Sequence, residues 1–164
     1  MPQRRVVFVI FSGFQALDLA GPHDVFQEAG ERSGGYDCQI VASCAGAVRS
    51  GSGLQVYAEH GVADLDPGGI DTLVVTGGNG ANQASRDPAL VSWIAAAGAG
   101  ARRVASVCTG VFLLAAAGLV AGRTVTTSVS IPVGSRSATP CSAHTCRPLP
   151  DRTGPRRDAT IWQR

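Results

Sequence analysis

The 164-residue sequence contains no lysine and no long apolar run. All fourteen basic residues are arginine, which, with the heavy use of alanine and glycine, we attribute to coding bias in a GC-rich bacterial genome. Without lysine there is no Gly-Lys-Ser/Thr phosphate loop. No stretch approaches the roughly 20 apolar residues that span a bilayer. Arg4-Arg5 is followed by only six apolar residues, too few for a secretory signal. We therefore expect a cytoplasmic protein with no membrane partner.

Disulfides, metals and nucleotides are disfavoured for similar reasons. Five cysteines, an odd number without regular spacing, do not form a disulfide framework. Cys141 and Cys146 lack the paired spacing of a zinc site, and His60, expected in a loop, has no companion ligand. The glycines that follow residue 76 do not have the spacing of a dinucleotide-binding loop. We expect neither a metal nor a cofactor.

Charge and proline divide the chain at residue 128. Residues 1–127 carry eight arginines against ten acidic residues, a net charge of −2, whereas residues 128–164 carry six against two, a net charge of +4. The first part is not a basic nucleic-acid surface, so we expect no direct nucleic-acid binding by this chain. Five of the nine prolines lie in the second part, which has few large apolar residues. We predict a folded domain over 1–127 and an irregular, basic, Pro/Ser/Arg-rich tail over 128–164.

Strand and helix signals alternate along residues 1–127. This pattern predicts a doubly wound α/β fold, with a mostly parallel sheet and helices on both faces. Val6–Phe11, a continuous apolar and β-branched run, is expected as the central strand, covered on both sides. The other expected elements are a helix over Asp18–Glu31 with Gly21-Pro22 near its start, strands at Cys38–Ala42 and Thr72–Thr76, a hairpin or edge region over Gly46–Glu59, and a helix opened by Asp87-Pro88.

The run Arg103–Gly118 predicts a strand that turns sharply into a helix at Cys108. Val104–Val107 form the strand, and an apolar helix follows the cysteine. The N–H groups of a first helical turn have no intrahelical partner and favour an anion. Thiolates, the reactive form of cysteine, are favoured at such positions. Thr109 adds a hydroxyl beside the sulfur, and Gly110 lets other backbone approach. The alternative is a buried structural cysteine that ends a strand.

Two further groups are expected beside Cys108, because ligands of open parallel sheets lie outside the carboxyl ends of the strands. Asp18 follows the first strand and could act as a general acid or base or hydrogen-bond the sulfur; the alternative is a helix cap. Gly77 and Gly78 follow a later strand, and their N–H groups could face an oxyanion; the alternative is an ordinary tight turn. His23, in or near the same helix as Asp18, is expected to be solvated rather than catalytic.

Four motifs in order resemble the PfpI/ThiJ branch of the class I glutamine-amidotransferase-like superfamily. They are Leu17–Phe26, Asp71–Gly78, Ala105–Gly110 and Ala116–Arg123. The resemblance covers about residues 5–127. It implies a flavodoxin-like fold with a nucleophile elbow, and a homodimer with active-site residues near the interface. It also implies a small-molecule ligand or substrate.

Two groups of this superfamily share the pattern. One is the amidotransferase-like N-terminal domain of GlxA-type AraC-family transcriptional regulators, in which the domain senses a small molecule and a separate helix-turn-helix pair binds DNA. The other is isonitrile hydratase, a lyase that adds water to an isonitrile to give an N-substituted formamide. That resemblance implies Cys108 as nucleophile, Asp18 as proton donor and acceptor, and Thr109 as a supporting hydroxyl. The residues around Cys108 resemble the regulators more closely.

The chain departs from the family pattern after Thr127. Relatives continue with His-Trp, where this chain has Ser128-Val129, so no Cys-His pair is expected there, and nothing places His144 near the elbow. We hypothesise that a frameshift replaced the C-terminal third; a natural short variant with a basic tail is the alternative. Three functions follow: a sensor domain without its DNA-binding domain, a cysteine-dependent lyase or hydrolase, or a non-catalytic remnant.

Overall fold

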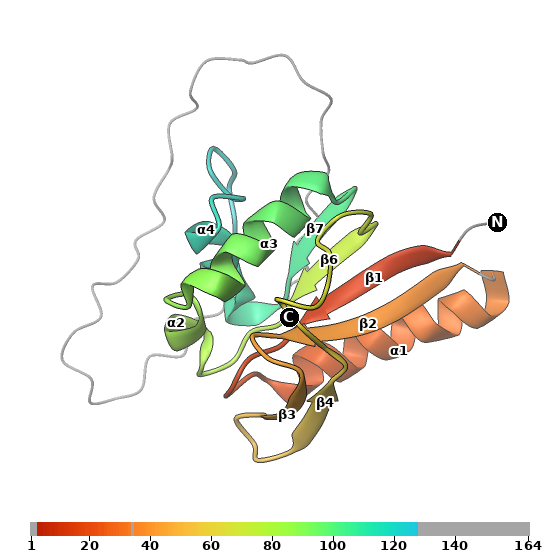
Figure 1. Cartoon of the computed structure of the whole chain (residues 1–164), viewed down its shortest axis with the longest axis horizontal. Helices are drawn as coiled ribbons and strands as arrows, with labels where there is room; N and C mark the ends of the chain where they lie inside the picture. The colour runs from red at the N-terminus through yellow and green to blue at the C-terminus, as the bar shows by residue number, and fades with distance from the viewer. Residues whose placement is uncertain (1–2, 34, 128–164) are drawn as a thin grey trace.

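The computed structural model describes residues 3–33 and 35–127, which form a layered α/β domain around a five-stranded sheet (Figure 1). All neighbouring strands are parallel, in the order β5-β2-β1-β6-β7. The predicted tail lies outside the described residues. The strands of the sheet are β1 Arg4–Val9, β2 Tyr36–Ala42, β5 His60–Gly61, β6 Thr72–Val75 and β7 Arg103–Ser106.

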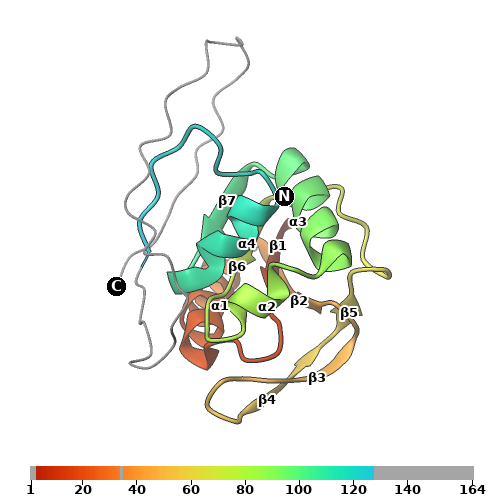
Figure 2. The same cartoon turned by 90° about the vertical axis from the view of Figure 1, so that its left-hand side faces the viewer.

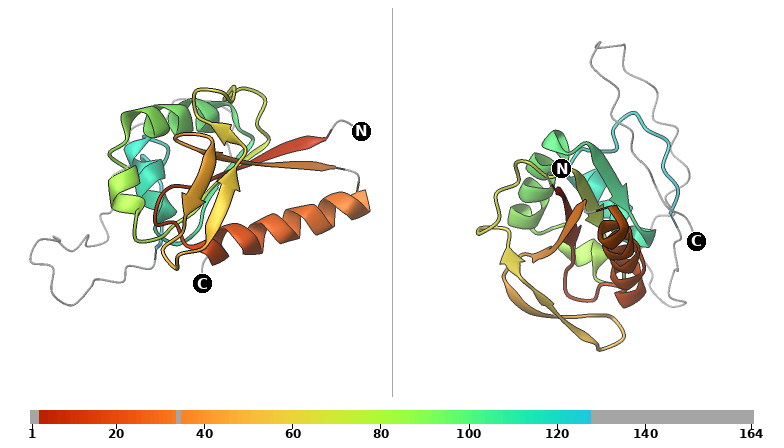
Figure 3. Two further views of the ribbon diagram at one scale, coloured as in Figure 1. Left: turned by 60° about the horizontal axis from the view of Figure 1, so that its bottom comes forward. Right: turned by 90° about the vertical axis from the view of Figure 1, so that its right-hand side faces the viewer.

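Helices cover both faces of this sheet, as predicted for a doubly wound fold. Helix α1 (Ala16–Ser33) lies on one side and α3 (Pro88–Gly100) on the other (Figures 2 and 3). The remaining helical elements are α2 (Ala81–Ala84), a 3₁₀ turn over Cys108–Gly110 and α4 (Val111–Ala116). In the part of the chain that the structure describes, no helix has both the length and the apolarity needed to cross a bilayer.

The extended region predicted between β2 and β6 is an antiparallel hairpin. Strand β3 (Gly46–Arg49) pairs with β4 (Gln55–Ala58) outside the main sheet. Figure 1 shows the hairpin projecting beside the first turns of α1. The hairpin therefore borders the end of the sheet at which the first helix begins.

The direction of chain winding reverses between β1 and β6. The connection from β1 through α1 leads outward to β2, whereas the connection from β6 through α2 and α3 leads the opposite way to β7. Because both crossovers between parallel strands are right-handed, they place their helices on opposite faces. A crevice for ligands forms where the winding reverses, outside the carboxyl ends of the strands. The topology therefore points to the segments that follow β1, β6 and β7.

Strand β1 is the middle strand and the centre of the core, as predicted. Val6, Val7, Phe8 and Val9 are fully buried, so side chains on both faces of this strand are covered. Burying one such side chain contributes on the order of 1.5–3 kcal/mol to stability. The loop that follows β1 is thus anchored to the most buried part of the molecule.

Three local predictions are wrong. Helix α1 begins at Ala16, so Pro22 lies inside it rather than near its start. Having no N–H, Pro22 cannot donate to the carbonyl of Asp18 four residues earlier. His60 belongs to the two-residue strand β5 and not to a loop. His23 packs against Phe8 with ring centroids 5.4 Å apart, and its side chain is only 26% exposed, so it is not simply solvated.

The predicted N-cap of α3 is confirmed. The Asp87 carboxylate accepts hydrogen bonds from the backbone N–H groups of Ala89 and Leu90, at 3.0 and 3.3 Å. Its other oxygen accepts a bond of 2.7 Å from the Ser43 hydroxyl, which follows β2. Chiefly because of the Ser43 bond, and further because of the two backbone bonds, the pKa of Asp87 is lowered below its usual 3.8. The cap therefore joins α3 to the loop after β2.

Replacing Asp87 by alanine should lower the free energy of unfolding by about 1 kcal/mol at pH 7, the usual cost of a lost N-cap. Because the pKa of Asp87 is lower in the folded chain, the ionised group stabilises the fold above pH 3.8, and this contribution is lost as the pH falls through the folded value. Urea unfolding measured at several pH values between 7 and 3 tests this. The difference in the free energy of unfolding between the parent and Asp87→Ala should become smaller as the pH falls. Ser43→Ala removes only one hydrogen bond to Asp87 and should lower the free energy of unfolding by less than Asp87→Ala does. If the difference between the parent and Asp87→Ala grew as the pH fell, the lowered pKa of Asp87 would be contradicted.

Candidate active site

The structure brings Asp18, Gly77 and Cys108 together outside the carboxyl ends of β1, β6 and β7. The Gly77 N–H donates a hydrogen bond of 3.1 Å to Oδ2 of Asp18. A Cβ atom built on Gly77 would lie 2.8 Å from Cβ of Cys108 and 2.6 Å from the backbone nitrogen of Thr109. Only glycine fits at this point, so residue 77 bonds to the acid through its N–H while the elbow packs where a side chain would otherwise stand. The predicted convergence of these groups is thus present in the fold.

Cys108 stands at the predicted corner between strand and helix. Strand β7 ends at Ser106, and the 3₁₀ turn that leads into α4 begins at the cysteine. Its φ is +52°, and it is the only residue other than glycine with a positive φ in residues 3–33 and 35–127. The left-handed conformation costs an L-residue roughly 1–2 kcal/mol. Strained residues of this kind cluster at functional sites, and the Cys108 side chain is half-buried rather than sealed.

The predicted apolar helix after the cysteine is present and short. Helix α4 ends at Ala116, and Gly118 follows with a φ of +73°, a conformation that ends helices. The elbow is therefore defined more by backbone conformation and by close contact with β6 than by a long helix dipole.

The two glycine N–H groups predicted to face an oxyanion have protein partners. Gly77 donates to Asp18, and Gly78 donates a bond of 2.9 Å to the hydroxyl of Thr109. The same hydroxyl donates a bond of 3.1 Å to the Gly78 carbonyl. The glycine loop thus positions the carboxylate and the threonine hydroxyl. An oxyanion role for these N–H groups stays a prediction, and it would require a ligand to replace the present partners.

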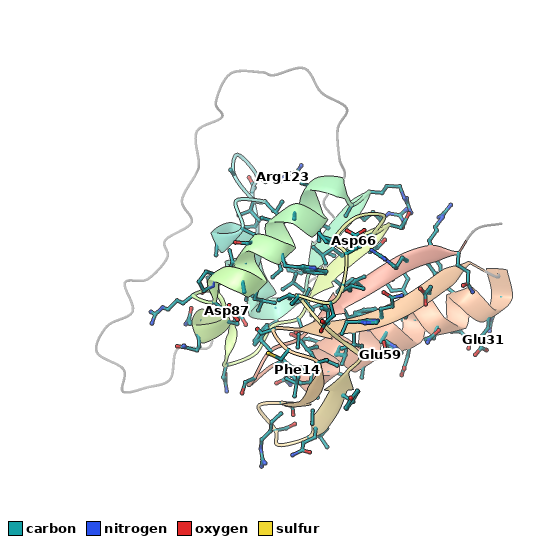
Figure 4. All side chains as sticks on the ribbon, in the orientation of Figure 1. Phe14, Glu31, Glu59, Asp66, Asp87 and Arg123 are labelled. Atoms are coloured by element: carbon teal, nitrogen blue, oxygen red, sulfur yellow. The ribbon has the colours of Figure 1, made fainter. Side chains whose placement is uncertain are left out.

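The loop before α1 is tied to the same glycines. The Gln15 N–H donates a hydrogen bond of 2.8 Å to the Gly77 carbonyl. The backbone carbonyl and N–H of Gly77 are therefore bonded to residues 15 and 18, respectively. Phe14, labelled in Figure 4, is fully buried. Its backbone forms isolated bridges with Ser50, in the turn of the hairpin, and with Gly78. The position of the acid relative to the elbow is therefore set by several backbone contacts.

Gly110 has the packing role expected of it. A Cβ atom at this position would lie 2.7 Å from the carbonyl oxygen of Thr76. The absence of a side chain lets the elbow turn pack directly on the end of β6. A direct contact of Gly110 with a ligand stays a prediction.

One contact at the elbow was not expected from local sequence. The Thr127 hydroxyl donates a hydrogen bond of 2.6 Å to the Cys108 carbonyl, across 19 residues of chain. The segment after α4 loops out from the domain before Thr127 meets the elbow (Figures 2 and 3). No local sequence pattern predicts that residue 127 contacts the elbow. The local signal in this segment is the pair Gly118 and Gly122, which indicates turns.

The other described cysteines differ from Cys108. Burial, and secondarily the charge of Asp37, raises the pKa of Cys38 to about 11, so this thiol stays protonated at neutral pH. Cys44 is exposed. Within residues 3–33 and 35–127, no three His, Cys, Asp or Glu side chains gather as a metal site would need.

The chain is similar to proteins of one known family. A model of the DJ-1/PfpI family matches residues 4–137. A protein from the cpoL 5′ region of Streptomyces lividans is 42% identical over 123 residues, which are 75% of this chain and 86% of that protein. The isonitrile hydratase of Pseudomonas putida is 33% identical over 123 residues, 75% of this chain and 51% of the hydratase.

A third relative and a solved structure extend the comparison. The HTH-type transcriptional regulator Rv1931c of Mycobacterium tuberculosis is 51% identical over 55 residues, 34% of this chain and 21% of the regulator. The crystal structure of a ThiJ/PfpI family protein from Pseudomonas syringae superposes with a TM-score of 0.68 at 29% identity, covering 74% of this chain and 49% of that one. The chain thus spans only about half of the hydratase and of this crystal structure.

Adding one methyl group at Gly77 should disrupt the site. In Gly77→Ala the new Cβ would overlap backbone of the elbow, so we expect a loss of about 2 kcal/mol or more in the free energy of unfolding. Gly21→Ala is the matched control: its Cβ meets nothing within 4 Å, and alanine inside α1 should stabilise by about 0.5–1 kcal/mol. Urea unfolding of both variants tests this, and a Gly77→Ala chain as stable as the parent would contradict the close contact.

The strain at Cys108 should appear as an unusual order of stabilities. Glycine adopts a φ of +52° without steric cost, whereas alanine keeps the strain. Cys108→Gly should therefore be more stable than Cys108→Ala by up to about 1 kcal/mol, although glycine gives the unfolded chain more freedom. The free energies of unfolding of the two variants, measured in urea, decide. A glycine variant less stable than the alanine variant by the full ~0.4–1 kcal/mol that the freedom of the unfolded chain alone costs would show that residue 108 is not strained.

Proposed function

The chain belongs to the DJ-1/PfpI family, and we propose that this domain recognises a small electrophilic molecule through the thiol of Cys108. It acts as a ligand-sensing domain like those of AraC-type transcriptional regulators. The negatively charged residues 1–127 make no direct contact with nucleic acid in this role. The cytoplasm, which keeps thiols reduced, is the compartment that suits such a site.

The observation that carries this proposal is the position of Gly77 between Asp18 and Cys108. A thiolate adds to an electrophilic carbon, and the negative charge that develops on the ligand then needs a proton. The carboxyl group of Asp18 accepts a hydrogen bond of 3.1 Å from the N–H of Gly77, the glycine against which the elbow packs, and is the group that would supply that proton.

A sensing role is supported by the regulator relative and by the state of the glycine loop. The 55 residues shared with Rv1931c are 51% identical, against 33% for the stretch shared with the hydratase. Gly77 and Gly78 direct their N–H groups to protein oxygens, an arrangement that holds the acid and the hydroxyl in place. Capture of a ligand needs only the thiol and a proton, whereas rapid turnover also gains from amide donors aimed at the developing charge.

A second candidate is a lyase that resembles isonitrile hydratase, favoured by the match that covers 75% of this chain. In that reaction the Cys108 sulfur forms a bond to the isonitrile carbon, and a proton from Asp18 adds to the same carbon, giving a thioimidate. Water then adds to this carbon, with its oxygen bonding to the carbon and one of its protons going to the nitrogen. The C–S bond breaks as the remaining hydroxyl proton returns to the Asp18 carboxylate. The products are an N-substituted formamide and the regenerated thiolate. A non-catalytic remnant, the third candidate, rests on residues 128–164, which lie outside the described residues.

We also propose that the domain forms a homodimer through the outer face of α1. Leu17 and Val25 lie eight residues apart on this helix and are 51% and 68% exposed. Residues at this spacing share a helix face, and burying them against a second copy would remove apolar surface from water. Because Leu17 immediately precedes Asp18, such an interface would border the active site.

Treating the purified chain with an alkyl isonitrile separates these functions. For a sensor we expect one equivalent of covalent adduct on Cys108, detected by mass spectrometry, with no accumulation of formamide. Cys108→Ala should form no adduct there. Asp18→Asn keeps an acceptor for the Gly77 N–H but cannot donate the proton, so it should form the adduct at least about tenfold more slowly.

The same experiment gives the outcomes that reject the sensor. Many equivalents of formamide, lost in both variants, would assign the lyase activity instead. If the parent chain gave neither adduct nor formamide, and Cys108 reacted with iodoacetamide no faster than the exposed Cys44, both thiol-based functions would be excluded.

A further inference from the structure

We propose that Thr127 is a positioning residue for Cys108, which holds the strained elbow in the conformation that presents the thiol. The inference rests on the proposed function insofar as Cys108 is the reacting group. It assigns a role to a residue that lies in neither the elbow nor the glycine loop.

The first support is the contact itself. The Thr127 hydroxyl donates 2.6 Å to the carbonyl oxygen of Cys108, and the Thr127 side chain is half-buried. This carbonyl belongs to the peptide that joins Cys108 to Thr109. Rotation of that peptide would break the bond and would also move the Thr109 nitrogen, which lies closely against Gly77. Thr127 therefore restrains the peptide to which the reacting side chain and its neighbouring hydroxyl are attached.

The second support is the need for a restraint at this residue. With a φ of +52°, Cys108 occupies a backbone conformation that L-residues disfavour. Such a conformation persists only where contacts with the surrounding structure hold it. A hydrogen bond made only in the strained conformation shifts the population toward that conformation. The thiol is then presented to a ligand for a larger fraction of the time.

The third support is the path of the return segment, residues 117–127. Leu119 and Val120 pack against the hydrophobic core, so its beginning is anchored. Gly118 and Gly122 each have a φ of +73° and reverse the chain. The segment is thus fixed at one end by the core and meets the elbow at its other end through Thr127.

The test measures the rate of Cys108 alkylation by iodoacetamide at pH 7, with peptide mass spectrometry and with Cys44 of the same molecule as reference. Thr127→Val removes the hydroxyl while nearly keeping the shape, and Thr127→Ser keeps the hydroxyl. The matched control is Thr126→Val, because Thr126 is exposed. We expect Thr127→Val to lower the ratio of the Cys108 rate to the Cys44 rate about fivefold, as loss of one hydrogen bond predicts. Thr127→Ser should restore the ratio, and the control should leave it unchanged.

Several outcomes would overturn the inference. An unchanged or higher ratio in Thr127→Val, or a Thr127→Ser chain that behaves like Thr127→Val, would show that the hydroxyl does not position the thiol. Thr127→Ala, read in the same way, replaces the valine variant if circular dichroism shows that the latter is misfolded. The proposed function fails separately, when the parent gives neither adduct nor formamide with an alkyl isonitrile and its Cys108 reacts with iodoacetamide no faster than Cys44. The role of Thr127 is judged from the change in this ratio between variants. It can therefore be decided whether Cys108 of the parent reacts quickly or slowly.

Discussion

The hydrogen bond between the Gly77 N–H and the Asp18 carboxylate is the contact on which the rest of the site depends. It works because residue 77 has no side chain, which leaves room for the backbone of the elbow directly against the glycine. Gln15 holds the carbonyl of the same residue. One residue thus fixes the relative positions of segments that follow three different strands. The acid and the cysteine are held near each other by contacts with this single glycine.

The location of this contact follows from the topology. Residues 6–9 of strand β1 are fully buried at the middle of the sheet, and the winding reverses between β1 and β6. The loops after these strands diverge toward opposite faces, which opens the place where the glycines, the acid and the cysteine meet. The stability of the core and the position of the reacting groups therefore share one cause: the strand that lies between the two layers of helices also leads, through the loop after it, into the helix whose first turn carries the acid.

Features governed by neighbouring residues were predictable from the sequence. The apolar run of β1, the Asp87 cap of α3 and the strand-to-helix corner at Cys108 each have a local signal, and the structure contains all three. Features governed by distant contacts were not. The start of α1 before Pro22, the occupied N–H groups of Gly77 and Gly78, and the Thr127 bond depend on what lies across the fold. Residue types indicated which groups could react, and only tertiary contacts determined how each group is held.

The proline inside α1 has a mechanical consequence for the acid. The backbone ladder of a helix couples each residue to the one four positions later, and the rung that would join residues 18 and 22 cannot form. Asp18 is therefore joined to the glycine loop through its side chain, while this one backbone bond to the next helical turn cannot form. A small displacement of the carboxylate, as a proton leaves it or a molecule arrives, can be absorbed within one helical turn and need not be transmitted along the remaining length of α1.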